Sequence, residues 1–322
     1  MKKIISISRR TDIPAFYSDW FMQRLEAGFA GWENPFSGQK IITSLKPDDV
    51  AAFVFWSKNF RPFLPHLKTI RERNIPVMFN YTITGLPHEF ESNVVDPEDA
   101  IESLKVISSL YSPEHINWRY DPIIISDRSD VAFHLERFSW LAGQLKGHVT
   151  RCYFSFATMY GKVERNFRNL ERAQQATISS PDNAARLFLA GKLADIASAH
   201  DIRMFSCCGE YLLADNRIEK GHCVDGKMLQ RLNPACSGGR EKPTRKECGC
   251  SESNDIGRYD TCPHGCIYCY ANINKERAIK LHKRHEVESA FLGYSKADSD
   301  RYLQEMDKKR NDRLTHPVIP YE

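Results

Sequence analysis

The residues Ala52-Phe-Val-Phe-Trp-Ser57 and Val77-Met-Phe-Asn-Tyr-Thr82 form two β-like runs, and the helix-like stretch Phe63–Arg73 separates them. Both runs are rich in the aromatic and β-branched residues that strands favour. Each run ends in polar residues rather than in a hairpin turn. A strand, a helix and a second strand in this order predict two parallel strands that are joined by a crossover helix.

The same alternation extends along the chain in both directions. Further strands are predicted at Lys3–Ser8, Phe29–Asn34, Ile116–Tyr120, Cys152–Ala157 and Arg203–Ser206. Further helices are predicted at Ser18–Ala27, Pro97–Leu110, Asp130–Lys146 and Asp182–His200. Repeated strand–helix units indicate an α/β fold, and we expect a parallel βα barrel that is partial or circularly permuted. A doubly wound open sheet is the alternative.

The composition indicates a packed protein of the reducing cytoplasm. The 322 residues carry 45 Lys plus Arg against 41 Asp plus Glu, a balance that does not by itself indicate a nucleic-acid or membrane partner. The apolar run Ile4–Ile7 is too short for a signal peptide, and no stretch approaches the roughly 20 apolar residues of a membrane span. Ten cysteines then suggest reduced thiols, metal ligands or catalysts rather than disulfides.

The composition of the sequence changes after about Tyr211, where Gly, Pro, Cys and charged residues become more frequent. We therefore divide the chain into a βα body at residues 1–215 and a cysteine-rich segment at residues 216–322 whose C-terminal helices pack on the body. Irregular chain is expected over Asn216–Thr261, before a helix resumes near Asn272. A loop of this length rarely stays ordered unsupported, so we expect metal or cluster ligands within it.

Charged residues follow several of the predicted strands. In both candidate folds the chemistry gathers where the carboxyl ends of parallel strands meet. The alternative is that such residues are salt bridges and helix caps. Because recurring Arg and Asp side chains at one rim suit a charged small ligand, the predicted catalytic residues are Arg9, Arg10, Asp12, Arg119, Asp121 and Glu210.

The strongest single pattern is Cys262-Pro-His-Gly-Cys266-Ile-Tyr-Cys269. One compact turn can aim these three sulfurs at one centre, and Gly265 supplies the backbone freedom for that turn. The helix beyond Asn272 would place free amide groups near an anionic thiolate cluster. An iron–sulfur cluster is the preferred interpretation. Zinc, with Cys248 and Cys250 as a second ligand pair, and a chance group of free thiols are the alternatives.

This spacing, with Tyr268 before the last cysteine, resembles the cluster loop of the radical S-adenosylmethionine enzymes. The wider string from Asp255 to Asn272, together with the opening Ile5–Asp12, resembles the uncharacterised family called domain of unknown function 1848. The first resemblance implies that Cys262, Cys266 and Cys269 ligate a 4Fe-4S cluster whose fourth iron chelates S-adenosyl-L-methionine. It also implies hydrogen abstraction by a 5′-deoxyadenosyl radical, and an electron donor such as a flavodoxin or ferredoxin.

The motif differs in position from that of these enzymes, in which it follows the first strand of the barrel. A circular permutation would restore the geometry, with Lys3–Ser8 as the second strand and the helix after Asn272 as the first helix. The glycine-glycine-glutamate element that holds the methionine amine has no recognisable counterpart.

The remaining cysteines suggest a second site. Cys208, Cys223, Cys248 and Cys250 are the predicted ligands of a second iron–sulfur cluster or a zinc ion, with Cys236 as an alternative ligand. Cys152 lies in a predicted strand as a small buried hydrophobe. Strand alternation turns Cys207 away from Cys208.

Three hypotheses for function follow. The first is a cytoplasmic radical S-adenosylmethionine-type enzyme that acts on an unknown substrate. The second is a non-catalytic iron–sulfur or zinc protein whose cysteine region is structural. The third is a nucleic-acid-acting protein that uses the basic residues Lys280, Lys283 and Arg284.

Overall fold

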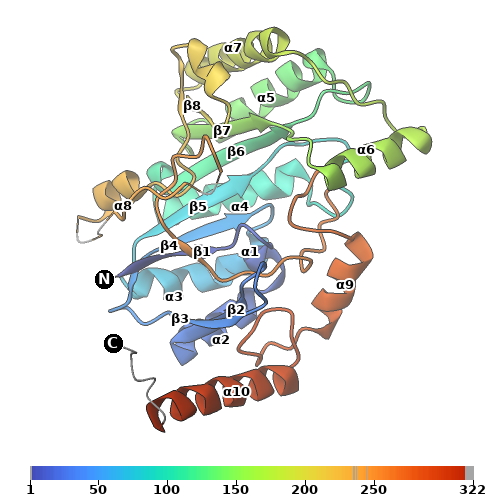
Figure 1. Ribbon diagram of the computed structural model, residues 1–322. Helices are drawn as coiled ribbons and strands as arrows, with labels where there is room; N and C mark the ends of the chain where they lie inside the picture. Colours follow the sequence, from blue (N-terminus) through green and yellow to red (C-terminus); the bar gives the residue numbers. More distant parts are fainter. Residues whose placement is uncertain (1, 235, 237, 244, 316–322) are drawn as a thin grey trace, which may run out of the picture.

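The computed structural model describes residues 2–234, 236, 238–243 and 245–315. Its body is one eight-stranded sheet in the order β10-β1-β4-β5-β6-β7-β8-β9, with parallel pairing between neighbours (Figure 1). Its strands are β1 (Lys3–Ile7), β4 (Val50–Ser57), β5 (Val77–Thr82), β6 (Ile116–Ile123), β7 (Arg151–Phe156), β8 (Arg203–Ser206), β9 (Ile218–Lys220) and β10 (Asn254–Asp255). Residues 316–322, the end of the predicted second segment, lie outside the described residues.

Helices connect most of these strands. The α-helices are α1 (Ile13–Phe16), α2 (Ser18–Ala27), α3 (Leu67–Glu72), α4 (Pro97–Leu110), α5 (Val131–Leu145), α6 (Gly161–Arg172), α7 (Asn183–Ala199), α8 (Gly226–Leu232), α9 (Lys275–Arg284) and α10 (Lys296–Thr315). Short 3-10 helices lie at η1 (Arg61–His66), η2 (Pro113–His115) and η3 (Glu210–Ala214). Asp side chains cap α1, α5, α7 and α8 by accepting a bond from a backbone amide of the first turn.

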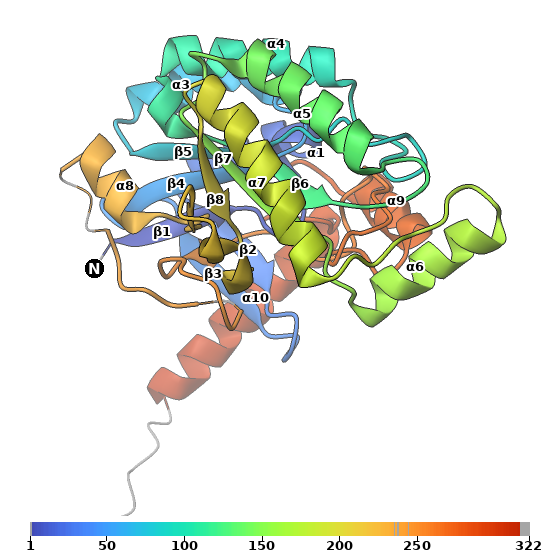
Figure 2. The same ribbon diagram turned by 90° about the horizontal axis from the view of Figure 1, so that it is seen from above.

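The two faces of the sheet are covered differently, because successive strand residues point to opposite sides. On one face Phe53, Phe79 and Trp118 join the main core, beneath the row of helices that Figure 2 shows along that side. On the other face Val54 and Tyr153 join a second core. Residues of α8 and of the cysteine-rich segment complete this second core. The cysteine-rich segment therefore covers this second face, which we call the inner face of the sheet.

The prediction of a mostly parallel α/β fold is confirmed, with three departures, the first of which is that β9, α8 and β10 lie within the stretch Asn216–Thr261 that was expected to be irregular. The predicted strand Phe29–Asn34 is present as β2 (Phe29–Glu33), but it pairs with β3 (Lys40–Ser44) in a separate antiparallel hairpin. The hairpin turn was missed because it is made by Asn34, whose side chain accepts the amides of Phe36 and Ser37, and by Gly38 at φ +68°. Closure into a barrel is not observed, since no pairing joins β10 to β9 within the described ranges.

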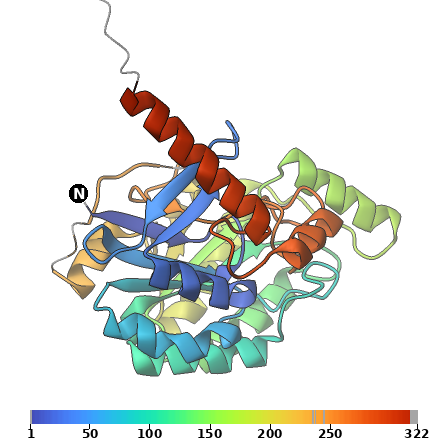
Figure 3. The same ribbon diagram turned by 90° about the horizontal axis from the view of Figure 1, so that it is seen from below.

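Both edge strands of the sheet come from beyond residue 215. β9 pairs with β8, and β10 pairs with β1 through Ile5–Asn254 and Ser6–Asp255. The last helix, α10, extends from the body past the β2–β3 hairpin (Figure 3), where Tyr302 and Leu303 pack near Phe291 and Phe29. Of the helices in the described part of the chain, none is both long enough and apolar enough to cross a membrane.

Candidate functional site

The stretch of residues 256–271, which carries Cys262, Cys266 and Cys269 and which we call the cysteine loop, starts directly at the carboxyl end of the edge strand β10. Asp255, the last residue of β10, accepts hydrogen bonds from Ser6 Oγ at 2.8 Å, Ser8 Oγ at 2.6 Å and the Arg9 amide at 2.8 Å. Gly257 follows at a point where an added Cβ would lie 1.9 Å from Ser8 Oγ, so only glycine fits. The start of the loop is therefore fixed to the end of β1.

The rest of the loop is fixed by side chains from other elements. Tyr17 donates to Thr261 O at 2.5 Å, Asn93 to Pro263 O at 2.9 Å and Asn166 to Ile267 O at 2.7 Å. Within the loop, Asn272 donates to Cys262 O at 2.7 Å. Because these bonds involve no sulfur, the protein itself holds the loop in shape.

The three loop thiols are partly buried and lie within electrostatic reach of one another. Gly265 adopts φ +71°, which confirms the predicted role of this glycine in the turn. The Ala271 amide donates to Cys269 Sγ at 3.3 Å. Burial raises the pKa of Cys266 to about 12, an effect that the nearby Lys58 charge partly offsets. Neutral thiols are thus favoured here unless a metal ion or further positive charge accompanies them.

A buried ion pair lies beside Cys266. Lys58 Nζ is 2.8 Å from Glu91 Oε1, and Glu91 also accepts bonds from Thr84 and Tyr268. Burial lowers the pKa of Lys58, but the charges of Glu91 and Cys266 raise it further, so the net pKa lies above the usual value. Sequence reasoning missed Glu91. The hydroxyl of Tyr268, a cofactor-binding residue by the resemblance, donates to Glu91.

Asp12 joins the loop to two strands. Its carboxylate accepts bonds from Ser57 Oγ at 2.7 Å and from the Lys58 amide at 2.8 Å, and it caps α1 through the Ala15 amide. His264 Nε2 of the loop lies 2.7 Å from Asp12 Oδ2. Asp12 therefore positions the loop over the carboxyl ends of β1 and β4.

Arg9 and Arg10 lie next to Asp255, with Nε atoms at 3.8 and 4.0 Å from its carboxylate. The Tyr270 hydroxyl of the loop donates to Arg9 O at 2.7 Å. Three buried polar atoms near these strand ends lack a hydrogen-bond partner among the described residues, and they are Arg10 Nη1, Thr11 Oγ1 and Trp56 Nε1. Buried polar groups are normally paired, so this edge of the sheet has unmet hydrogen-bonding capacity.

A second group of cysteines lies at the inner face of the sheet. Cys207 Sγ is 3.3 Å from Cys223 Sγ. The thiols of Cys223 and Cys250, of Cys250 and Cys248, of Cys248 and Cys208, and of Cys208 and Cys207 are close enough to shift each other's pKa. These five thiols form a closed ring, which we call the thiol ring.

Cys207 in this ring corrects the sequence prediction, which turned it away from Cys208. Alternation holds only within a strand, and β8 ends at Ser206. Cys208 adopts φ +59°, in the left-handed region, so the chain turns there and both thiols reach the ring. Cys236 is buried in the same apolar cluster, and Cys152 packs in the main core on the opposite face.

Arg119 and Asp121 belong with the thiol ring rather than with the loop. Arg119 Nη1 donates to Cys223 Sγ at 2.9 Å, and its Nη2 pairs with Asp121. Trp56 lies between the two arginines, with its ring centre 5.3 Å from Arg119 Cζ and 6.0 Å from Arg9 Cζ. Glu210 lies outside both groups, exposed and 3.0 Å from Lys220 Nζ.

The donor chemistry of the two groups fits thiolate-bound metal differently. Within the described ranges, no three His, Cys, Asp or Glu side chains surround one point as a ready ligand set for a single ion. The loop offers three thiols beside a cation and backbone amides, which suits a cluster with one iron left open. The ring offers five, which is more than the four ligands of a closed site.

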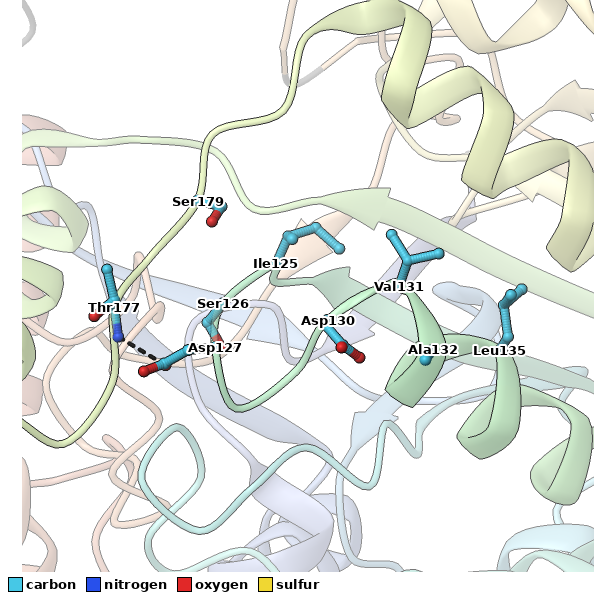
Figure 4. Close-up of a pocket in the computed structure, with 9 residues that line it drawn as sticks. All are labelled: Ile125, Ser126, Asp127, Asp130, Val131, Ala132, Leu135, Thr177 and Ser179. Carbon is cyan, nitrogen blue, oxygen red and sulfur yellow. Dashed lines mark hydrogen bonds between the residues drawn. The ribbon is translucent and has the colours of Figure 1, made fainter.

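Two cavities lie near the surface. One, of about 570 Å³, lies between α6 and the loop and is lined by Cys266, Asn166, Arg165 and Lys275 among others. The other, of about 600 Å³, lies between the start of α5 and residues 177–179 (Figure 4). Its lining includes Asp130, which already caps α5, and it contains no cysteine. Of these two cavities, the first borders a thiol of the loop, Cys266.

The chain is thus a parallel α/β protein that gathers two groups of cysteines at the carboxyl ends of its strands. It belongs to the family described as domain of unknown function DUF1848, whose model matches residues 4–271. The match includes the loop and the thiol ring. None of the curated proteins compared with the chain matches it.

Proposed function

We propose that this protein is a radical S-adenosylmethionine-type enzyme on a partial, circularly permuted βα barrel, with a 4Fe-4S cluster bound by Cys262, Cys266 and Cys269. The observation that carries the proposal is the position of these cysteines. They follow the edge strand β10, which pairs in parallel with β1, at the carboxyl ends of the sheet.

The order of elements supports the permutation. β10 lies beside β1, and the cysteine loop and α9 follow β10 along the chain, in the order of first strand, cluster loop and first helix in the enzymes that the motif resembles. His282 of α9 packs against the rings of Phe16 and Tyr17, with ring centres 5.6 and 5.2 Å apart, so α9 is joined to the elements that follow β1.

When bound, such a cluster supplies the electron that breaks a sulfonium carbon–sulfur bond of S-adenosylmethionine, and the resulting 5′-deoxyadenosyl radical abstracts hydrogen from the substrate. The chain's residues would hold and shield it. The Ala271 amide donates to Cys269 Sγ, which would favour a cluster-bound thiolate, and Lys58 places a positive charge beside Cys266. A flavodoxin or ferredoxin is the proposed electron donor.

Arg10, Thr11 and Trp56 are the proposed contacts to S-adenosylmethionine. Each has a buried polar atom without a partner in the described part of the chain. A guanidinium donor suits the methionine carboxylate, and a hydroxyl and an indole N–H suit other polar groups of the molecule. Of the three, only the Thr11 hydroxyl can also accept a hydrogen bond, so it alone could bind the methionine amine that the missing glycine-glycine-glutamate element would hold.

The test is reductive cleavage of S-adenosylmethionine. Protein reconstituted anaerobically with iron and sulfide, then reduced with dithionite, should convert S-adenosylmethionine into 5′-deoxyadenosine, measured by liquid chromatography. Cys269→Ala should lower the rate by at least about a hundredfold, because the cluster loses one of its three ligands. Cys152→Ala is the matched control, since Cys152 is buried in the opposite core. Absence of 5′-deoxyadenosine from iron-loaded wild-type protein would contradict the proposal.

A further inference from the structure

We infer that the thiol ring of Cys207, Cys208, Cys223, Cys248 and Cys250 is a second iron–sulfur site, in which four of the five thiolates ligate one cluster. This inference does not rest on the proposed function of the loop. It concerns residues from three separate segments, at the ends of β8 and β9 and in the stretch before β10.

Proximity is the first observation. The Sγ atoms of Cys207 and Cys223 are 3.3 Å apart, too far for a disulfide bond of about 2.05 Å. The other thiols of the ring each lie close enough to two neighbours to shift their pKa, which joins all five. Cysteines of different segments are 15 to 43 residues apart and do not meet in this way through local geometry, so the fold has brought the three segments together.

Charge is the second observation. Arg119 Nη1 donates to Cys223 Sγ at 2.9 Å, and Arg245 Nη2 lies 3.5 Å from Cys207 Sγ. Arg119 is buried on the inner face, where an unpaired guanidinium would be costly. Asp121 supplies one negative charge to balance the two arginines, and a thiolate-bound cluster would supply further negative charge. Arginine donors to the sulfurs are a known means of tuning such clusters.

The spacing of the cysteines favours a cluster over zinc. A zinc knuckle pairs cysteines two to four residues apart, so that both reach one ion. Here the near pairs are adjacent, Cys207 with Cys208, or have one residue between them, Cys248 with Cys250. The surroundings are apolar, with Tyr153, Phe205 and other core residues covering the ring, which suits a closed and fully ligated centre.

The decisive experiment removes the first site and counts what remains. In Cys262→Ala/Cys266→Ala/Cys269→Ala, reconstituted anaerobically as the full chain, we expect about four iron and four sulfide per protein. Its electron paramagnetic resonance signal after reduction should be unchanged by S-adenosylmethionine. Iron below one per protein, or stoichiometric zinc instead of iron after reconstitution, would overturn the inference.

Single alanine variants in that triple-variant background then identify the ligands. Four of the five should lose the iron and one should keep it, whereas Cys152→Ala should keep it as the matched control. Should a ring variant fail to fold, Arg119→Lys provides a second measurement. Arg119→Lys should retain the iron and shift the cluster's reduction midpoint, since the planar donor to Cys223 is lost. Iron retained in all five single variants, or an unchanged midpoint in Arg119→Lys, would count against the site.

Discussion

The cysteine loop and the thiol ring are held in different ways. The loop presents three thiols, and although the Ala271 amide donates to Cys269 Sγ, bonds from other elements that involve no sulfur, such as Tyr17 to Thr261 and Asn93 to Pro263, fix its course. The ring presents five thiols, and sulfur itself takes part in holding its chain, since Cys250 Sγ accepts the Val224 amide at 3.4 Å and Cys248 Sγ the Cys250 amide at 3.4 Å. A preformed loop with a missing fourth ligand suits catalysis, and a saturated ring suits a structural or electron-storing role.

The largest expected effect concerns the ion pair beside the loop. Glu91→Gln should lower the free energy of unfolding of the metal-free protein by about 3–5 kcal/mol, because it leaves Lys58 buried without its partner. Asp99→Asn is the matched control. It breaks the exposed Arg61–Asp99 pair and should cost less than about 0.5 kcal/mol. Urea denaturation measures both, and similar losses would show that Lys58 and Glu91 do not stabilise the loop.

Two glycines allow each region to be disturbed separately. An added Cβ would lie 1.9 Å from Ser8 Oγ at Gly257, at the start of the loop, and 1.6 Å from Gly238 O at Gly226, beside the ring segment. Each alanine variant should cost about 1–3 kcal/mol and lower the iron content of its own region only. Gly161→Ala meets no atom within 4 Å and should leave both regions unchanged. Loss of iron from both regions in either variant would mean that they fold as one unit.

Removal of the metal should change the rate of amide hydrogen exchange more in the ring segment than in the cysteine loop. In the metal-free protein, backbone amides of residues 245–252 should exchange at least about tenfold faster than in the loaded protein, because their thiols lose the cluster that joins them. Amides of residues 256–271 should change less, since Asp255, Asn93 and Tyr17 still hold that loop. Mass spectrometry of peptides measures the exchange, and equal acceleration in both stretches would refute the preformed loop.

The smallest expected effect concerns Trp56, which lies near both the cysteine loop and the thiol ring. Trp56 stands between Arg9 and Arg119. Trp56→Phe keeps an aromatic side chain at this position and removes the indole N–H, which has no partner among the described residues. It should therefore leave the free energy of unfolding within about 0.5 kcal/mol of wild type while weakening S-adenosylmethionine binding about tenfold or less. Equilibrium dialysis measures the binding, and unchanged affinity would remove Trp56 from the proposed contacts.

The parts of the fold that could be predicted are those with a strong local pattern. β5 and α4 have the predicted bounds, because a run of strand formers and a Pro-initiated amphipathic helix each decide their own structure. β10 was missed because two residues carry no periodicity, and its existence depends on β1. The hairpin partner β3 was missed because its short pattern does not distinguish a strand from irregular chain, and its structure depends on pairing with β2.

The site was predicted in the same uneven way. The loop cysteines have a diagnostic spacing, whereas Glu91 is a single glutamate whose partner Tyr268 is 177 residues away in sequence. Arg119 lies within β6 rather than at the end of its strand, and no pattern could show that its donor would reach Cys223 rather than an open cofactor site. Contacts over such distances depend on the tertiary fold, and sequence spacing alone does not carry them.

The central claim is that the loop binds a cluster with one open iron and the ring a cluster with none. Electron paramagnetic resonance of the reduced, fully loaded protein, with and without S-adenosylmethionine, tests this most directly. We predict two cluster signals, of which only the one that disappears in Cys262→Ala/Cys266→Ala/Cys269→Ala changes when S-adenosylmethionine is added. A loop signal that S-adenosylmethionine leaves unchanged, or a change confined to the ring signal, would contradict this account.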